Sequence, residues 1–213
     1  EITYFCSMEM SSFYLDIVKD RLYCEGTTSI ERRSTQTVLT EVLKVLVRII
    51  SPVLSFTADE IWERIPEALK EEESVHLSKW IEANPEYISG ELAQKWDKIA
   101  RIRREVNKKL EAERQAGLIG HSLDAKVLLN VVNDEYSFIK DYTESEVSDL
   151  FIVSQVKFVN DSLAESEIEG ISITVEKASG EKCERCWKYD EKVGHNHNHP
   201  DVCPRCAGVL EKM

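Results

Sequence analysis

The chain has 213 residues, of which 42% are hydrophobic and 31% charged, and its formal net charge at pH 7 is −12. These values predict a soluble folded protein of one to three domains. They argue against a general nucleic-acid binder, which needs a basic face. The longest apolar run, residues 42–54, is interrupted by Lys44, Arg48 and Pro52. It is shorter than the roughly 20 residues of a membrane helix, so no membrane partner is expected.

The first residues predict a piece of a longer chain in a reducing compartment. The sequence begins with glutamate and enters a structural pattern partway, and no secretory signal peptide is visible. Cysteines in such a chain are expected to stay reduced, which favours a cytoplasmic location. Cys6 and Cys24 stand alone, as small buried hydrophobic residues do.

The N-terminal part has apolar residues at helical spacing. Residues 9–24 predict one helix, which Ser11 or Ser12 could cap, and residues 31–51 predict a second, longer helix. Its apolar positions recur every three or four residues. Pro52 is expected to end this second helix.

A third helical stretch, "SFTADEIWERIP", follows Pro52. Thr57 and Glu60 have the spacing of a capping box, and Pro66 ends the stretch. An extended connector comes next. Together these pieces predict a mainly α chain whose residues 1–88 form an antiparallel helical bundle with one core, truncated at its N-terminus.

A long basic helix is predicted over residues 89–114 and forms a linking segment, residues 89–121. Residues 95–116 hold eight Lys or Arg and only four Asp or Glu, against the acidity of the rest of the chain. Gly117 and Gly120 are expected to end the helix. The basic side chains that lie away from its apolar stripe are Lys98, Arg101, Arg104, Lys108 and Lys109.

Beyond residue 122 the periodicity changes. Residues 124–132, 150–159 and 170–178 are rich in β-branched residues and partly alternate, so they predict three strands. An acidic helical crossover joins the first two. This part is therefore expected to be a small α+β domain over residues 122–180.

Four cysteines close the chain in two C-x-x-C pairs, which sixteen residues separate: Cys183, Cys186, Cys203 and Cys206. Each pair can present two sulfur atoms from one tight turn, and two such turns complete a tetrahedron that suits zinc. We expect one structural zinc ion in a finger over residues 181–213. Metal binding would then supply much of its folding energy.

Other readings of the cysteines stay open. Two disulfides or a dithiol redox centre would use the same residues, although nothing resembles the thioredoxin-like unit that a redox pair opens. His195, His197 and His199 could compete as ligands, but four thiolates already fill the shell and solvated loop histidines are the simpler interpretation.

Trp187 follows the first cysteine pair directly. Its indole could pack over the metal turn, or it could present a flat face to a nucleobase. Arg185 and Lys188 flank it and favour RNA.

The motif "KCERCWKY…VG…CPRCAGVL" resembles the C-terminal zinc finger of bacterial isoleucyl-tRNA synthetases. The segments "FYLDIVKDRLYC", "RRSTQTVL" and "ISPVLSFTADEIWERIP" are similar to the anticodon-binding helical domain of class I synthetases for branched aliphatic amino acids. Two further segments, "ESVHLSKW" and "IRREVNKKLEAERQAGLIGHSLDAKV", resemble the isoleucine branch. The resemblance covers essentially the whole chain.

The resemblance implies a parent enzyme that activates isoleucine with ATP and attaches it to tRNA. Its catalytic motifs, of the HIGH and KMSKS type, do not occur here, and the editing domain is missing too. The chain is therefore expected to be the monomeric C-terminal part that binds the anticodon arm of tRNA(Ile) and carries no catalytic residue. The upstream catalytic and editing domains of the same chain would be its further partners.

The resemblance also implies where RNA binds. Arg185 and Trp187 match the family's C-x-R-C-W motif and are expected at the anticodon loop, with Lys188 beside them. On the basic helix, Arg101, Arg104 and Lys108 could follow the phosphate backbone, although a solvated charged face is an equal alternative.

Two other classes of function remain. Certain DNA glycosylases carry a similar finger, but their catalytic N-terminal proline is absent and a helical bundle does not fit them. A zinc-dependent interaction domain without nucleic acid would agree with the net charge of −12.

Overall fold

The computed structural model describes residues 1–161 and 163–212. Contacts between residues divide the chain into two compact units, one made of Glu1–Gly26 with Gly90–Met213 and the other of Thr27–Ser89. Residues 1–26 thus belong with the C-terminal part rather than with residues 27–89. The helical bundle expected over residues 1–88 is not confirmed, and the four domain boundaries stay predictions.

The unit Thr27–Ser89 is helical. Ser29 accepts a hydrogen bond from the amide of Arg32 (3.1 Å) and so caps the first helix. Trp62 is fully buried against Val47, and its Nε1 donates to the carbonyl of Glu72 (2.9 Å). The elements are the helices α3 (Ile30–Ile50) and α4 (Ser55–Arg64) and the short 3-10 turns η2 (Glu67–Leu69), η3 (Val75–Leu77) and η4 (Pro85–Tyr87).

The capping box predicted at Thr57 is wrong, because α4 begins earlier. The amide of Leu54 donates to the carbonyl of Ile50 (2.8 Å), and the amide of Ala58 donates to that of Leu54 (2.8 Å). Helical winding therefore resumes immediately after the turn at Pro52. Thr57 lies inside the first turn of the helix and does not cap it.

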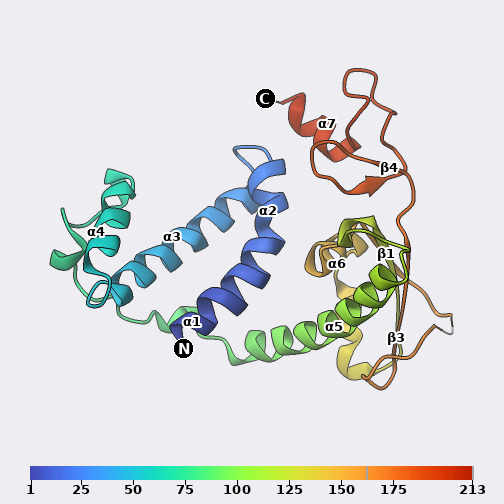
Figure 1. Cartoon of the computed structure of the whole chain (residues 1–213), viewed down its shortest axis with the longest axis horizontal. Helices are drawn as coiled ribbons and strands as arrows, with labels where there is room; N and C mark the ends of the chain where they lie inside the picture. The colour runs from blue at the N-terminus through green and yellow to red at the C-terminus, as the bar shows by residue number, and fades with distance from the viewer. Residues whose placement is uncertain (162, 213) are drawn as a thin grey trace. The chain divides into compact units, whose positions relative to one another are not determined.

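The other unit begins with a continuous helical segment, drawn in blue in Figure 1. It comprises α1 (Ile2–Tyr4), the π-helical η1 (Phe5–Tyr14) and α2 (Leu15–Cys24). Ser12 lies within it, and its hydroxyl donates to the carbonyl of Met8 (2.9 Å). The prediction that Ser11 or Ser12 caps this helix is therefore wrong. Cys24 is buried as expected, whereas Cys6 is exposed.

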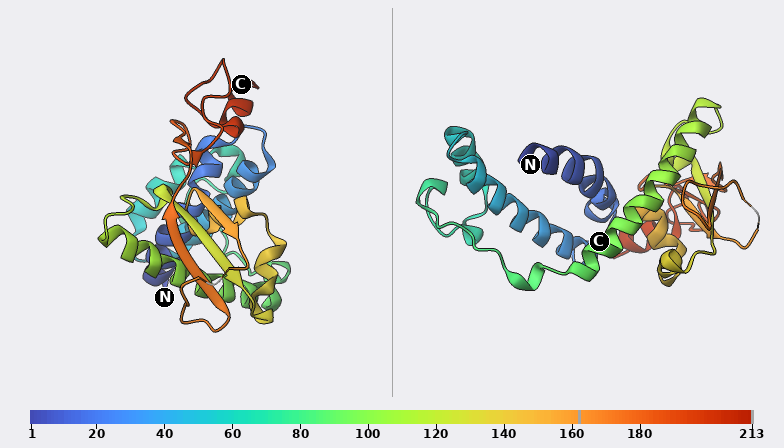
Figure 2. Two further views of the ribbon diagram at one scale, coloured as in Figure 1. Left: turned by 90° about the vertical axis from the view of Figure 1, so that its right-hand side faces the viewer. Right: turned by 90° about the horizontal axis from the view of Figure 1, so that it is seen from below.

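A three-stranded sheet and one long helix form the main core. Helix α5 (Gly90–Gln115) places Ile99, Ile102 and Val106 in the same core as the sheet, and Gly117 ends it at φ +79°. Figure 2 shows α5 crossing one face of the sheet. The strand order is β2 (Gln155–Phe158), β1 (Ala125–Val131), β3 (Ile171–Lys177), with β1 parallel to β2 and antiparallel to β3.

The expected strand 150–159 is shorter in the structure. Its first two residues belong to α6 (Glu144–Phe151), which ends where Ile152 adopts the left-handed conformation at φ 58°. The parallel pairing of β1 with β2 needs a crossover connection, and α6 supplies it with the 3-10 helix η6 (Asp134–Asp141). A further 3-10 turn, η5 (Ser122–Asp124), leads into β1.

The N-terminal helical segment packs on the same unit. Phe13 meets Trp96 of α5 edge to face, with ring centroids 6.1 Å apart, and the guanidinium of Arg103 lies 4.8 Å from the Phe13 centroid. In the part of the chain that the structure describes, no helix combines the length and apolarity that crossing a membrane requires.

Gly180 directly precedes the finger. This residue has φ +89°, and a side chain there would come within 2.4 Å of the backbone of Asp190, so only glycine fits. The close approach lets β4 (Glu181–Lys182) pair with β5 (Tyr189–Asp190). After a long loop, α7 (Pro204–Leu210) completes the finger.

Candidate metal centre and nucleic-acid interface

Four sulfur atoms converge in the finger. The Sγ atoms of Cys183, Cys186, Cys203 and Cys206 all lie within 4.8 Å of one another. Cys183, Cys203 and Cys206 are buried and Cys186 is half-buried. Among the described residues, no histidine joins this group. The loop histidines considered as competing ligands therefore lie outside it.

The spacing of these sulfurs fits a tetrahedral ion. A Zn–S bond of about 2.3 Å implies an edge of about 3.8 Å between two thiolates of a regular tetrahedron. The Sγ atoms of Cys186 and Cys203 are 3.8 Å apart. An all-thiolate donor set suits zinc, and a four-thiolate shell leaves no position for a substrate.

Backbone hydrogen bonds shape the two turns. The amide of Trp187 donates to the carbonyl of Cys183 (2.9 Å) and closes the first turn. The amide of Cys203 donates to the sulfur of Cys183 (3.3 Å), which ties the second pair to the first. Pro204 then starts α7, whose first turn contains Cys206.

Hydrogen bonding within the cysteine cluster opposes the ionisation of Cys186. The hydrogen bond with Cys203 is the largest cause that raises the pKa of Cys186 to about 11. Since a metal ion binds the thiolate form, binding must release protons from the site. A bound cation would favour the thiolate form of Cys186.

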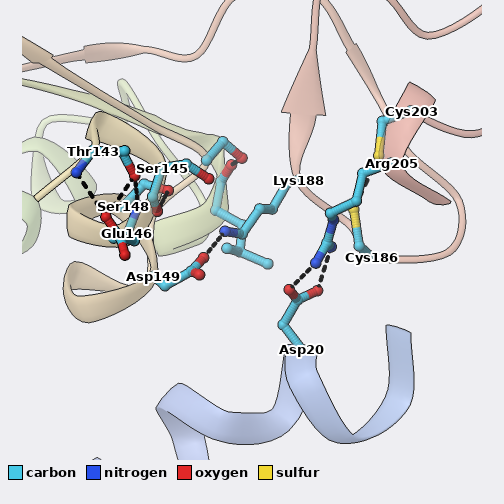
Figure 3. Close-up of polar contacts among 12 residues, drawn as sticks. Asp20, Thr143, Ser145, Glu146, Ser148, Asp149, Cys186, Lys188, Cys203 and Arg205 are labelled. Carbon is cyan, nitrogen blue, oxygen red and sulfur yellow. Dashed lines mark hydrogen bonds and ion pairs between the residues drawn. The ribbon is translucent and has the colours of Figure 1, made fainter. Parts of the chain in front are cut away.

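Both cysteine pairs carry an arginine just before their second cysteine, and both arginines reach the C-terminal end of α2. Arg185 Nη1 donates to the carbonyl of Cys24 (2.5 Å), and Cys24 Sγ donates to the carbonyl of Arg185 (3.6 Å). Arg205 makes two bonds to Asp20 (2.5 and 2.7 Å) and one to Glu25 (2.9 Å). We call Arg185 and Arg205 the arginine clamp. Figure 3 shows the ion pair that Arg205 forms with Asp20.

The ion pair of Arg205 is reflected in the acidity of its partner. Burial alone would raise the pKa of Asp20, but the hydrogen bonds and charge of Arg205 bring that pKa below its usual value. Asp20 therefore stays ionised at neutral pH and holds the guanidinium in place.

Lys188 docks the finger on a second element. Its ammonium forms an ion pair with Asp149 of α6, and only 18% of its side chain is exposed. Figure 3 shows the side chain directed at Asp149. The structure thus gives Lys188, which the sequence suggested as an RNA contact, a partner within the protein.

Trp187 is exposed and held in an unusual backbone conformation. It has φ 66°, a conformation that is open to glycine but that L-residues other than Asn and Asp rarely adopt. Of its surface, 60% is accessible. The ammonium of Lys182 lies 5.2 Å from the ring centroid. The indole therefore does not seal the metal turn.

The basic face of α5 is mixed with acids. Arg101 and Arg104 are exposed and line a surface hollow of about 500 Å³ together with Glu135 and Glu167. Lys108 forms ion pairs with Glu105 (2.8 Å) and Glu167 (2.6 Å). The hydrogen bond to Lys108, together with one from the amide of Glu167, outweighs burial and lowers the pKa of Glu105, so this pairing persists at neutral pH.

Sequence reasoning missed Asp20 and Arg205. The available signal was the repeated C-x-R-C pattern, which places an arginine at the same position of both turns. Nothing in the sequence indicated that α2, more than 150 residues earlier, would receive them.

Two families of known proteins match the chain. Residues 1–129 match the anticodon-binding domain of tRNA ligase. This match covers more than half of the 213 residues. The chain belongs to this family of anticodon-binding domains. Residues 180–208, which include the four cysteines, match a zinc finger found in FPG and IleRS.

Similar curated proteins carry the name isoleucine–tRNA ligase. One from Kosmotoga olearia is 45% identical over 98% of this chain and 23% of its own length. Relatives from Syntrophotalea carbinolica (46%, over 97% of this chain and 22% of the relative) and Petrotoga mobilis (45%, over 99% and 23%) match similarly. The chain thus spans less than a quarter of the length of these relatives.

Proposed function

We propose that this anticodon-binding domain is the tRNA-binding part of an isoleucine–tRNA ligase and recognises the anticodon stem-loop of tRNA(Ile). Its similarity to isoleucine–tRNA ligases over nearly the whole chain supports this function. Activation of isoleucine with ATP, ligation to tRNA and editing would belong to other parts of the enzyme. The enzyme would act in the cytoplasm as a monomer.

The four cysteines would hold one zinc ion with a structural role. The convergence of four thiols and the match to a zinc-finger family support this assignment. A closed thiolate shell orients the residues around it rather than performing chemistry. The ion would fix the positions of Arg185, which lies between Cys183 and Cys186, and of Trp187, which follows Cys186.

The exposed indole of Trp187 carries the proposal for RNA contact. A large aromatic side chain at a strained backbone position, open to solvent, costs stability without contributing to the core. Unpaired loop bases are the part of RNA that proteins read by stacking. We infer that Trp187 stacks on a base of the anticodon loop.

The other candidate contacts follow from their surroundings. The guanidinium of Arg185 has five N–H donors and uses one of them to bond the carbonyl of Cys24. The remaining donors would be available to RNA. Arg101 and Arg104 would contact phosphates along the stem. Lys108 and Lys188 would have to leave their carboxylate partners to do the same, so we place them second.

Replacing Trp187 tests this function directly. The full chain with Trp187→Ala should bind the anticodon stem-loop of tRNA(Ile) about 5- to 150-fold more weakly in a fluorescence titration, since stacking on a base contributes about 1–3 kcal/mol. Zinc content should not change, because the side chain coordinates nothing. Trp80→Ala, which removes another exposed indole (68% accessible), is the matched control. Unaltered affinity at near-physiological salt would remove Trp187 from the interface.

A second nucleic acid distinguishes the alternatives. The full chain should prefer the stem-loop to duplex DNA, with an affinity that falls steeply as salt rises. The match over residues 1–129 already favours a tRNA ligase over a DNA-repair finger or an interaction domain. Equal binding to duplex DNA, or binding to neither, would contradict the proposed function.

A further inference from the structure

A groove of about 430 Å³ lies between the last turns of α2 and the first cysteine pair. Its walls also include residues 121–123 and the end of α6. This volume is within the range of about 300–1,000 Å³ in which proteins bind small ligands. The RNA contacts proposed so far lie on the finger side of this groove, and none lies on its α2 side.

Two exposed aromatic rings line the groove from different elements. Tyr23, in the last turn of α2, is 76% exposed, and Trp187 of the finger is 60% exposed. Neither ring contributes to a hydrophobic core of the described residues. Flat, accessible rings on both sides suit a planar aromatic ligand such as a nucleobase.

The acidic charges of the lining are balanced. Each carboxylate there has a cationic partner: Asp16 pairs with Lys19 (2.6 Å), Asp20 with Arg205 (2.5 Å) and Asp149 with Lys188. The acids are therefore compensated and do not present a repulsive field to RNA. Lys19 and Lys188 are compensated by the same pairs, whereas Arg185 bonds the uncharged carbonyl of Cys24 and keeps its charge. The two rings, rather than the charges, therefore favour a nucleobase in this groove.

The two sides of the groove are fixed relative to each other. Arg185 and Cys24 exchange two hydrogen bonds across its floor, from guanidinium to carbonyl and from thiol to carbonyl. Arg205 adds the ion pair with Asp20. A groove whose walls are already held in place loses less entropy when a ligand enters.

We propose that this groove binds one unpaired nucleobase of the anticodon loop, with Tyr23 as the stacking residue on the α2 side. The proposal rests on the tRNA-binding function above and adds a binding residue that lies outside the finger. His121, exposed at the same groove, offers a ring nitrogen to the edge of the base.

The test uses the full chain and the anticodon stem-loop of tRNA(Ile). Tyr23→Ala should weaken binding about 5- to 150-fold, the range for loss of one stacked base. Tyr23→Phe keeps the ring and should stay within about twofold of the parent, on the same stacking argument. Tyr4→Ala, which removes a tyrosine that is 61% exposed in α1 and does not line the groove, is the matched control.

Salt dependence separates stacking from phosphate contact. Loss of a stacked base lowers affinity by the same factor at every salt concentration. Loss of a phosphate contact instead changes the slope of the logarithm of the affinity against the logarithm of the salt concentration. Tyr23→Ala should therefore leave the slope unchanged. A reduced slope would overturn the assignment to a base.

Stem-loops with one abasic position identify the base. At the position whose base Tyr23 contacts, the parent chain and Tyr23→Ala should bind equally, because the partner is gone. If the difference persists at every loop position, the groove does not hold a base. If Tyr23→Ala binds normally while Trp187→Ala does not, the groove proposal fails and the proposed function stands. If neither variant weakens binding, both stacking assignments fail. The proposed function itself fails if the parent chain does not prefer the stem-loop to duplex DNA.

Discussion

Arg185 and Arg205 occupy equivalent positions in the two cysteine turns and bond residues on the last two turns of α2. A helix leaves its last carbonyls without partners inside the helix and carries partial negative charge there. Arg185 satisfies one of these carbonyls, while Arg205 neutralises Asp20. The clamp therefore uses the chemistry of a helix C-terminus to orient the finger.

Replacing Arg205 should loosen the finger without emptying its metal site. Arg205→Gln removes a bidentate ion pair whose arginine side chain is 39% exposed, so we expect a loss of about 0.5–1 kcal/mol in the free energy of unfolding. Amide hydrogen exchange in residues 181–212 should become faster, and zinc content should be unchanged. Arg64→Gln, at an exposed pair with Glu60, is the control. Loss of zinc from Arg205→Gln would show instead that the arginine maintains the metal site itself.

At the scale of elements, α6 connects the sheet to the finger. Thr143 and Glu146 form a capping box at its start, with the amide of Thr143 donating to Glu146 (2.7 Å) and the amide of Glu146 donating to Thr143 (3.2 Å). One turn further on, Asp149 receives Lys188 of the finger. The stability of this short helix therefore also supports the position of the finger.

The charge at this cap makes stability depend on pH. The backbone hydrogen bond from Thr143 is the largest cause that lowers the pKa of Glu146 in the folded chain. A lowered pKa means that the contribution is complete above the unfolded pKa of about 4.3 and is lost as pH falls through the folded value. Glu146→Gln keeps the side-chain acceptor but not the charge, so it should cost about 0.3–1 kcal/mol at pH 7. Denaturant titrations should show this difference shrinking below pH 4; a constant difference would contradict the electrostatic origin.

At the scale of the whole molecule, the finger has little core of its own. Its buried cluster consists mainly of three of the cysteines with Val202 and Ala207, whereas the sheet domain buries a much larger set of aliphatic side chains. Small domains of this kind depend on a metal for stability. Zinc would therefore determine whether the arginine clamp and the groove exist.

Removing the metal should unfold the finger and spare the rest. A chelator, or Cys186→Ser, should raise amide exchange in residues 181–212 to unprotected rates, while Thr27–Ser89, a separate compact unit, stays protected. Stem-loop affinity should fall with the loss of the groove. Because the thiolates bind the ion, zinc affinity should also fall as pH is lowered. A finger that stays ordered without metal would exclude the structural role; Cys6→Ser, at an exposed cysteine outside the cluster, is the control.

Most elements were predictable because their signals are local. The apolar periodicity of residues 31–51 and 89–114 corresponds to α3 and α5 within one residue at each end, and the β-branched segments correspond to three strands. The predictions of helix and strand boundaries were wrong where helical backbone hydrogen bonds extend past the residues that the sequence indicated. Thr57 has the spacing of a cap, but the turn before it already winds as a helix, and residues 150–151 have strand-like composition but complete α6.

The sequence by itself indicated the four cysteines that converge, because C-x-x-C spacing is a property of a single turn and two such turns suit one ion. It also indicated Trp187, which is adjacent to one of these cysteines. Only the tertiary structure decided what surrounds that site. The partners of Arg185, Arg205 and Lys188 lie on α2 and α6, so packing between distant segments, rather than any local pattern, brings Asp20, Asp149 and Tyr23 to the finger.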